Sequence, residues 1–245
     1  MDKPPALDVS DLSFTYPDGS RALESVTFRV APGETVGLVG PNGAGKTTLF
    51  LCLAGVLPVP PGRVRVAGLD PGVPAERRRL PTQLGIVFQN SDDQLFSATV
   101  GDDVAFGPLN FGLPPDEVRR RVAEALARVG LAGSENRVPL HLSGGEKRRA
   151  ALAGVLAMRP EVLLLDEPSI FLDPRGRREL IRLLQDLGGT QVIAAHDLDL
   201  LLDTCRRVLL LDRGRLLADG PAAEVLADAA LMEAHGLEVP YRLRA

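Results

Sequence analysis

Apolar and polar residues alternate near the start of the chain, as in Leu12 and Phe14 and again through Val26–Val30. A period of two is typical of strands that bury one face. Pro17-Asp18-Gly19 interrupts the alternation and is typical of a turn. We therefore expect a small antiparallel β layer within residues 7–30.

In later runs, apolar residues occupy nearly every position. Thr35–Val39 and Val162–Leu165 are of this kind, which is typical of parallel strands buried on both faces. Further strands are predicted at 64–66, 85–88 and 192–195, and a closing hairpin at 208–218.

Helices are predicted between these strands. One extends from about Gly45 to Leu57, where Pro58 ends it. Another begins at Asp173-Pro174, with an aspartate cap and a proline in the first turn, and ends at Gly188-Gly189. Its leucines share one face, and they are Leu180, Leu183, Leu184 and Leu187. Strand, helix and strand in this order predict a mainly parallel sheet with right-handed crossovers.

Residues 90–158 have a different pattern. Strand signals are absent there, and Val118, Val122 and Leu126 recur at helical spacing on one face. We therefore predict an α/β fold in which residues 1–89 and 159–245 form the core and residues 90–158 form a helical subdomain. Residues 222–245 carry no motif that indicates a function.

Composition narrows the class of protein. Of the 245 residues, 45% are hydrophobic, which provides a buried core and excludes a disordered or fibrous chain. The formal charge of −4 has the wrong sign for a chain whose main partner is nucleic acid. Ala150–Met158 is the longest apolar stretch and is far shorter than the roughly 20 residues that cross a bilayer. Met1–Pro5 lacks the apolar segment of a secretory signal, so we expect a cytosolic chain.

Two sets of residues have simple structural interpretations. Cys52 and Cys205 lie in apolar helical patterns, too far apart for a metal-binding spacing, and are expected to be buried thiols. Acidic residues lie among or beside most of the basic clusters, which we interpret as solvated helix faces. These clusters are Arg77–Arg79, Arg119–Arg121, Lys147–Arg149 and Arg206–Arg207.

The first chemical motif is glycine-rich. Gly40–Thr47 matches G-x-x-x-x-G-K-[ST] and lies between a predicted strand and a predicted helix. Its glycines allow backbone N–H groups and the helix N-terminus to face a phosphate, while Lys46 reaches the β- and γ-phosphate oxygens and Thr47 binds Mg²⁺. A purely structural glycine turn is the alternative. The residues predicted to bind the nucleotide here are Asn42, Gly43, Gly45, Lys46, Thr47 and Thr48.

Two carboxylates follow the strand at 162–165. Asp166 and Glu167 are expected at the C-terminal edge of the sheet, where open α/β sheets bind ligands. There, Asp166 can hold Mg²⁺ through water, and Glu167 can polarise the water that attacks the γ-phosphate. Alone, such a pair is more often a loop start or a helix cap. Together with the glycine-rich motif, it favours a nucleotide hydrolase over a binding module.

A second glycine-rich segment is Leu142–Glu146. Ser143 and Glu146 fit a capping box at the start of a helix. Two adjacent glycines in a first helical turn cost about 1 kcal/mol each relative to alanine. Because a helix N-terminus without side chains can receive an anion, we infer a second phosphate-binding element at Ser143, Gly144 and Gly145.

In their order along the chain, the motifs resemble those of the ATP-binding cassette ATPases. They are Gly40–Thr47, Gln89, Leu142–Glu146, Leu165–Pro168 and His196. The resemblance extends from about residue 7 to residue 220. It implies that ATP and Mg²⁺ are the cofactors and that two subunits, identical or related, sandwich two ATP molecules head to tail. Ser143 and Gly145 would then act in trans.

The resemblance also assigns single residues. Tyr16 matches the aromatic residue that stacks on adenine, although its position alone indicates a strand residue. Gln89 matches the glutamine that contacts Mg²⁺ and the attacking water and couples the site to a membrane partner. His196 matches the histidine that holds the γ-phosphate, so Glu167, His196 and Gln89 form the implied catalytic set. Asp173 matches the aspartate of a loop at the dimer interface.

A narrower resemblance is to the energy-coupling factor importers, and within them to the cobalt and nickel branch. It rests on Phe88–Phe96, Asp102–Pro108, Gly144–Arg149 and Leu172–Arg178. It implies a peripheral ATPase on the cytoplasmic face of the cell membrane, with no nucleic-acid partner. Its partners would be a transmembrane scaffold subunit and a membrane substrate-binding subunit. The metal would be their cargo, since the sequence has no cluster with metal-ligand spacing.

Leu95, Phe96 and Phe106 begin the predicted helical subdomain. They are candidates to line the groove that docks a membrane subunit, and core packing is an equal alternative.

Two features of the sequence depart from the family pattern. Glu146 replaces the usual glutamine; both complete the capping box, and we expect the substitution to be tolerated although its charge opposes a triphosphate. Ile170-Phe171 replaces smaller residues, which leaves the symmetry of the two ATP sites open.

Three alternative functions stay open. The first is an importer subunit for a vitamin. The second is a soluble cassette protein acting on ribosomes or DNA, which the acidic charge disfavours. The third is a non-hydrolysing regulator, which the presence of Lys46, Asp166, Glu167 and His196 disfavours.

Overall fold

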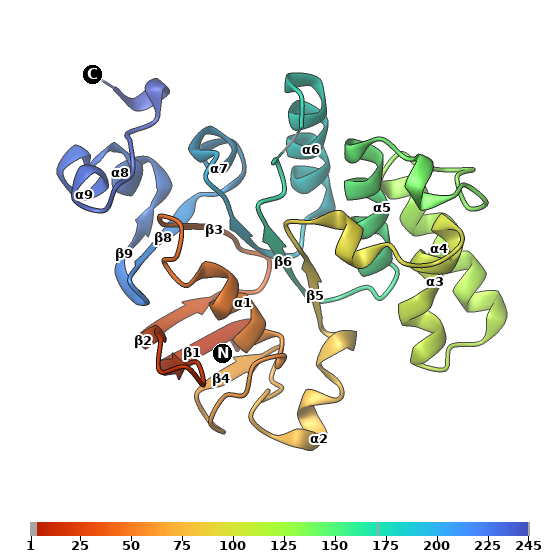
Figure 1. The fold of residues 1–245 in the computed structure, drawn as a ribbon, viewed down its shortest axis with the longest axis horizontal. Coiled ribbons are helices and arrows are strands. Elements are labelled where there is room, and N and C mark those ends of the chain that lie inside the picture. Colours follow the sequence, from red (N-terminus) through yellow and green to blue (C-terminus); the bar gives the residue numbers. More distant parts are fainter. Residues whose placement is uncertain (1–3, 171, 245) are drawn as a thin grey trace.

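The computed structural model describes residues 4–170 and 172–244, which fold into two β-sheets, with most of the helices placed around the larger one (Figure 1). The smaller sheet is antiparallel, with the order β2-β1-β4. Its strands are Leu7–Thr15 (β1), Arg21–Val30 (β2) and Val64–Val66 (β4). It contains the antiparallel layer predicted within residues 7–30.

The larger sheet has the order β5-β6-β7-β3-β8-β9. Its strands are Thr35–Val39 (β3), Leu84–Val87 (β5), Val162–Asp166 (β6), Thr190–Ala194 (β7), Arg207–Asp212 (β8) and Arg215–Pro221 (β9). Neighbours from β5 to β8 are parallel, while β9 pairs with β8 in antiparallel orientation. The predicted α/β fold with a mainly parallel sheet is confirmed.

The strands of the larger sheet from β5 to β8 are largely buried on both faces, which explains why apolar residues occupy successive positions in them; the edge strand β9 is partly exposed. On β6, Val162 and Leu164 pack into one hydrophobic core with β1, β2 and helix α1 (Lys46–Leu53). Leu163 and Leu165, which point to the opposite face, pack into a second core built largely from the later helices. The strand is therefore fixed between two layers, and its carboxyl end is held at a defined position.

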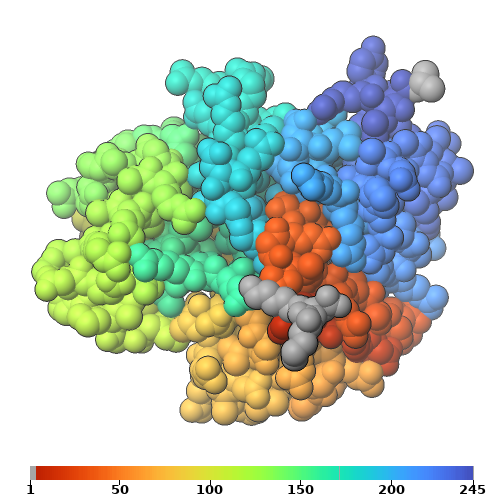
Figure 2. Space-filling model, turned by 180° about the vertical axis from the view of Figure 1, so that it is seen from behind, coloured from red at the N-terminus to blue at the C-terminus, as the bar shows by residue number. Residues whose placement is uncertain are grey.

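Helices lie at both ends of the molecule. Figure 1 shows α3, α4 and α5 together at one end, and Figure 2 shows them from behind as a green lobe opposite the blue C-terminal residues. The bounds are Val100–Asn110 (α3), Pro115–Arg128 (α4), Gly144–Leu156 (α5), Pro174–Leu187 (α6) and Leu198–Thr204 (α7). The shorter helical segments are Pro74–Arg77 (α2), Leu80–Thr82 (η1), Ser91–Gln94 (η2) and Pro139–His141 (η3).

One helix boundary differs from its prediction. Helix α1 ends at Leu53, with Ala54 as its cap, and not at Leu57. The backbone of Gly55 has a φ of +68°, which takes the chain out of the helical region three residues before Pro58. Glycine, and not proline, therefore ends this helix.

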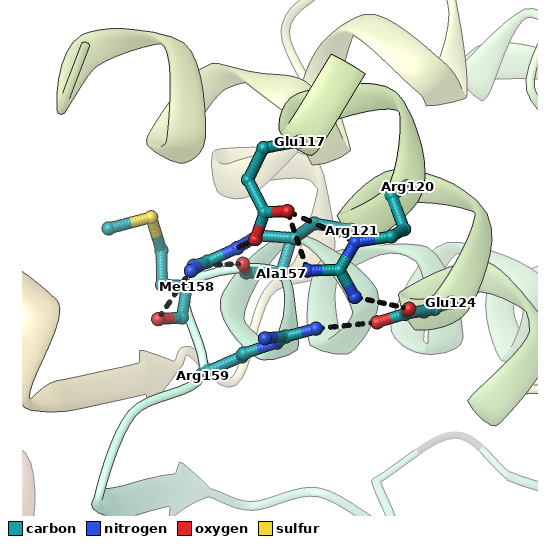
Figure 3. Close-up of polar contacts among 7 residues, drawn as sticks. All are labelled: Glu117, Arg120, Arg121, Glu124, Ala157, Met158 and Arg159. Carbon is teal, nitrogen blue, oxygen red and sulfur yellow. Dashed lines mark hydrogen bonds and ion pairs between the residues drawn. The ribbon is translucent and has the colours of Figure 1, made fainter. Parts of the chain in front are cut away.

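An ion-pair network fastens α4 to the end of α5 (Figure 3). Arg121 donates to the Glu117 carboxylate at 2.7 Å and to two backbone carbonyls beyond α5 at 3.2 and 3.5 Å. Glu124 accepts from Arg120 at 2.8 Å and from Arg159 at 2.7 Å. The network joins the helical lobe to the segment that leads into β6.

The C-terminal segment folds onto the larger sheet. Helices Ala222–Ala227 (α8) and Ala229–Ala234 (α9) bury Leu226 and Met232 completely, and the turn Tyr241–Leu243 (η4) follows them. His235 Nδ1 lies 2.9 Å from an oxygen of Asp212, at the end of β8. Residues that carry no sequence motif are thus part of the core.

Both cysteines are buried thiols, as predicted. Burial raises the pKa of Cys52 to about 12 and that of Cys205 to about 11. Among the described residues, no helix is both long and apolar enough to span a bilayer.

Candidate nucleotide-binding site

A cleft of about 530 Å³ lies at the carboxyl ends of β3, β6 and β7. It brings together eleven of the residues predicted from the sequence. They are Tyr16, Asn42, Gly43, Gly45, Lys46, Thr47, Thr48, Gln89, Asp166, Glu167 and His196. Parallel strands place their carboxyl ends at one edge of a sheet, which explains why motifs far apart in sequence meet here.

The loop between β3 and α1 is packed so closely that two of its positions require glycine. A Cβ atom on Gly40 would lie 2.0 Å from the carbonyl oxygen of Leu211. Gly45 has a φ of +108°, and a Cβ atom there would lie 2.6 Å from the carbonyl oxygen of Ala22. Backbone groups of β8 and β2 therefore approach the loop closely at these two positions and restrict them to glycine.

Lys46 turns back over this loop. Its Nζ atom donates to the carbonyl oxygens of Gly40 at 2.6 Å and Pro41 at 3.1 Å. Burial lowers the pKa of the ammonium group, against the charges of Glu167 and Asp166, which raise it. The loop thus presents one buried cation beside the N-terminus of α1, which suits a bound phosphate.

The hydroxyl of Thr47 donates to Asp166 Oδ2 at 2.8 Å, which links the start of α1 to the end of β6. Asp166 is 3% exposed, and burial raises the pKa of its carboxyl, opposed by the Thr47 hydrogen bond and the Lys46 charge. The Gln89 amide lies in the same cleft. The oxygen atoms that could ligate a metal ion here therefore belong to a hydroxyl, a carboxylate and an amide. These oxygens fit Mg²⁺, which completes its shell with phosphate and water.

Glu167 has an unusual environment for a glutamate. Its backbone adopts a φ of +50°, in the left-handed region, and its side chain is nearly buried. Oε2 accepts from the backbone N–H of His196 at 3.1 Å, whereas the buried Oε1 has no hydrogen-bond partner among the described residues. Burial raises the pKa of this carboxyl, opposed by His196 and Lys46, while Asp166 adds to the rise. A buried acceptor without a partner is suited to take a proton from water.

Two aromatic side chains border the cleft. His196 Nε2 lies 2.9 Å from Asn42 Oδ1 and 3.5 Å from Glu167 Oε1. The Tyr16 hydroxyl lies 3.0 Å from Thr48 Oγ1, and its ring meets Phe14 edge to face with centroids 5.0 Å apart. Tyr16 is therefore held at the rim of the cleft.

The predicted capping box at the start of α5 is confirmed. Ser143 Oγ accepts from the N–H of Glu146 at 3.3 Å, and the Glu146 carboxylate accepts from the N–H of Ser143 at 2.9 Å. Among the described residues, a Cβ atom on Gly144 would meet nothing within 4 Å, and one on Gly145 would meet a methyl of Leu172 at 3.7 Å. Packing against the described part of the chain therefore does not explain these glycines.

Comparison with known proteins identifies the family. Residues 23–170 match the family model described as ABC transporter, and this span includes Gly40–Thr47, Ser143–Glu146 and Asp166-Glu167. The chain belongs to the ABC transporter family. As an ABC ATPase, it hydrolyses ATP to power transport, and the sequence prediction of an ATPase is confirmed.

Relatives of this ABC ATPase are similar along nearly its whole length. A protein of Methanothermobacter thermautotrophicus, named energy-coupling factor transporter ATP-binding protein EcfA, is 48% identical over 96% of this chain and 76% of its own. The structure of cbiO1 from Clostridium perfringens, described as part of the ABC transporter complex cbiONQ, has a TM-score of 0.83 at 39% identity and covers 95% and 94% of the two chains. A dimeric structure of the ATP-binding cassette MJ0796 with ADP and Pi has a TM-score of 0.78 at 26% identity, covering 88% and 98%.

Four predicted residues of the ABC ATPase do not line its own cleft. Ser143, Gly144 and Gly145 belong to the first turn of α5, and Asp173 caps α6 by accepting from the N–H of Gly176 at 2.6 Å. The cap at Asp173 is as predicted. Of the unusual pair at 170–171, Ile170 lines the cleft and Phe171 lies outside the described residues.

The sequence interpretation missed Arg148. The cluster Lys147–Arg149 was expected to be a solvated face, and this is wrong at Arg148, which is 6% exposed. Its guanidinium donates to the carbonyl oxygens of Glu167 at 2.7 Å and Gln89 at 2.6 Å. The signal was its helical spacing, because Arg148 shares a face with Gly144 and Leu152, four residues away on either side.

Proposed function

We propose that this ABC ATPase is the nucleotide-binding subunit of an energy-coupling factor type importer. The observation that carries hydrolysis is the buried Oε1 atom of Glu167, which has no hydrogen-bond partner among the described residues and belongs to the cleft that also holds the Thr47–Asp166 pair. The relative named EcfA and the structural similarity to cbiO1 support the type of importer.

Each residue of the cleft has a role in this proposal. Lys46 and the backbone N–H groups of the loop hold the β- and γ-phosphates. Thr47, Asp166 and Gln89 hold Mg²⁺, which when bound neutralises the charge of the phosphates. Glu167 accepts a proton from the attacking water. His196 Nε2, which contacts Asn42 Oδ1, would donate its hydrogen bond to the γ-phosphate in place of Asn42 when the nucleotide binds.

Tyr16 is the proposed adenine platform. Its ring is held at the rim of the cleft by the Thr48 hydrogen bond and the edge contact with Phe14, so one face is available for stacking. The site of this chain would then be complete for a whole ATP molecule apart from the contribution of a second subunit.

That second subunit would supply the bare end of α5. Ser143, Gly144 and Gly145 lie outside the cleft of their own chain, yet the glycines leave their backbone open to an approaching anion. A head-to-tail dimer would place this end against the ATP of its partner, with Asp173 at the interface. The similarity to the dimeric cassette MJ0796 supports this arrangement.

The proposed contact with the membrane subunits lies on the helical lobe of residues 90–158. Phe96 and Phe106 are 63% and 50% exposed, and their rings pack edge to face with centroids 4.9 Å apart. Leu95 packs against the core instead. Docking of the exposed pair on a transmembrane scaffold subunit would hold the ATPase at the cytoplasmic face of the membrane.

The proposed cargo is cobalt or nickel, supported by the similarity to cbiO1 of cbiONQ. The test is to purify the chain with its membrane partners, reconstitute the complex in vesicles and measure ATP-driven uptake of Co²⁺, Ni²⁺ and vitamins. Metal uptake supports the proposal, and uptake of a vitamin alone assigns a different cargo. Glu167→Gln is the control: it should bind ATP yet release no phosphate, and wild-type turnover would remove Glu167 from its role.

A further inference from the structure

Arg148 connects three parts of the site that the sequence places far apart. It belongs to the second turn of α5, whose first turn carries Gly144 and Gly145. From there its guanidinium reaches the carbonyl oxygens of Glu167 and Gln89, at 2.7 and 2.6 Å. Hydrogen bonds from a charged donor are short and strong, and two of them fix the direction of the group.

The surroundings of Arg148 indicate that its guanidinium serves to orient the backbone carbonyl groups that it binds. Arg148 as a whole residue is 6% exposed, and among the described residues its guanidinium forms hydrogen bonds to carbonyl oxygens and no ion pair with a carboxylate. Burial lowers the pKa of this group, while the charge of Glu167 raises it. A buried charge is unfavourable unless it is hydrogen-bonded, so the two carbonyl oxygens are the groups that retain Arg148 in this position.

The carbonyl of Glu167 needs such a partner. The φ of +50° at Glu167 belongs to a region that residues other than glycine rarely adopt and that persists only where neighbouring groups hold it. The N–H of Glu167 is held by Ala194 at 2.8 Å, on β7, and its carbonyl oxygen is held by Arg148. The orientation of the carboxylate in the cleft therefore depends on a side chain of α5.

We propose that Arg148 is a positioning residue that aligns Glu167 and Gln89 with the start of α5. Gly144 lies one helical turn before Arg148, so any shift of α5 that engages a partner's nucleotide also moves the guanidinium. Glu167 then reaches its working orientation when α5 is docked. This inference rests on the proposed function, because it assumes that Glu167 activates the water.

The test compares Arg148→Met with a matched control, Arg121→Met. Arg121 is also a largely buried arginine that donates to two carbonyls, those of Ala157 and Met158, within the α4 network (Figure 3). It does not line the cleft. Both variants remove a guanidinium from two carbonyl oxygens. Only Arg148→Met removes it from the carbonyl oxygens of Glu167 and Gln89.

The readouts are kcat and KM for ATP hydrolysis per folded molecule, the thermal unfolding temperature and the affinity for a non-hydrolysable ATP analogue. For Arg148→Met we expect kcat to fall about 10- to 100-fold, with KM and affinity within about twofold of the wild type. Arg121→Met should lower the unfolding temperature and keep the wild-type kcat. Arg148→Lys, which can serve one carbonyl at a time, should have an intermediate kcat.

A kcat within about twofold of the wild type in Arg148→Met, or an equal loss in Arg121→Met, overturns the inference. If Arg148→Met does not fold, Arg148→Lys decides by the same criterion: a lower kcat at constant KM supports the inference, and a wild-type kcat overturns it. Glu167→Gln is measured in parallel. If that variant loses turnover while Arg148→Met keeps it, the inference fails and the proposed function stands; turnover retained in Glu167→Gln overturns the proposed function itself.

Discussion

The Glu146 carboxylate lies 2.6 Å from the guanidinium of Arg137, across the open end of α5. The Arg137 hydrogen bond, with those from the Ser143 backbone and hydroxyl, lowers the pKa of Glu146 to about 2. The charge that Glu146 introduces in place of the usual glutamine is therefore permanent near neutral pH, and it is balanced by a neighbouring cation. This pairing explains why an acidic residue is compatible with a helix end that would receive a phosphate.

Removing the positive charge of Arg137, which balances Glu146, should raise KM for ATP. For Arg137→Gln we expect KM for ATP to rise roughly fivefold, since an unbalanced unit charge near an exposed phosphate is worth about 1 kcal/mol. Glu146→Gln in the same chain should restore KM, because glutamine keeps the cap without the charge. Steady-state phosphate release at low and high salt measures both effects. A KM that rises in the double variant as much as in Arg137→Gln would contradict the charge argument.

The two glycines in the first turn of α5, Gly144 and Gly145, should be dispensable for folding and required for turnover. Gly145→Ala places a methyl group where Leu172 is its nearest neighbour, so unfolding free energy should stay constant or rise by up to about 1 kcal/mol. Turnover should fall about 100-fold, because the methyl group blocks the approach of the partner's phosphate. Thermal unfolding gives the free energy of unfolding, and phosphate release gives the turnover.

Gly85→Ala is a control in which a glycine is required for folding. Its Cβ would lie 2.1 Å from a Val155 methyl, which should destabilise the fold by about 1–3 kcal/mol.

The sequence predicted the parallel strands of the larger sheet well because these strands are largely buried on both faces. Leu163 and Leu164 belong to different cores, so the positions of β6 from Val162 to Leu165 are all apolar, and such a run is recognisable. The cleft was predictable for a related reason. Close backbone contacts exclude a side chain at Gly40 and at Gly45. The motif therefore has glycine at these two fixed positions, which makes it recognisable in the sequence.

Arg148 and the C-terminal segment were not predictable in the same way. A run of basic residues is usually solvated, and the burial of Arg148 depends on carbonyl groups that only the folded chain brings to α5. Leu226 and Met232 lie in very short helices, so no helical period could develop. In both cases the residues are buried by groups that lie far away in the sequence, so the local pattern does not reveal their burial.

The proposed adenine platform can be tested with two variants of Tyr16 that separate the contribution of its ring from that of its hydroxyl. Tyr16→Phe keeps the ring and loses the Thr48 hydrogen bond, whereas Tyr16→Ala loses both. Stacking of a base on an aromatic ring is worth about 1–3 kcal/mol, so Tyr16→Ala should weaken ATP binding by roughly 5- to 150-fold. Tyr16→Phe should bind ATP nearly as the wild type does. Titration with a fluorescent ATP analogue measures both, and equal losses in the two variants would show that the hydroxyl, not the ring, is needed.

The buried carboxyl of Glu167 should affect activity and stability in opposite directions. Burial raises its pKa, so the acid limb of kcat/KM should lie above the value of about 4.3 for an exposed glutamate. A carboxyl with a raised pKa in the folded state contributes stability that is present below its unfolded pKa and is lost as pH rises through the folded pKa. Above that folded pKa, the wild type therefore carries an unfavourable buried charge that Glu167→Gln lacks.

Glu167→Gln should consequently unfold at a higher temperature than the wild type at neutral pH, and the difference should shrink as pH falls through the raised pKa. Asp166 also has a raised pKa, but it is present in both proteins and largely cancels in the difference. Thermal unfolding of the two proteins without nucleotide, between pH 4.5 and neutral pH, measures this effect. A difference that is constant over this range would mean that Glu167 titrates as an exposed glutamate does, and that burial does not prepare it to accept a proton from water.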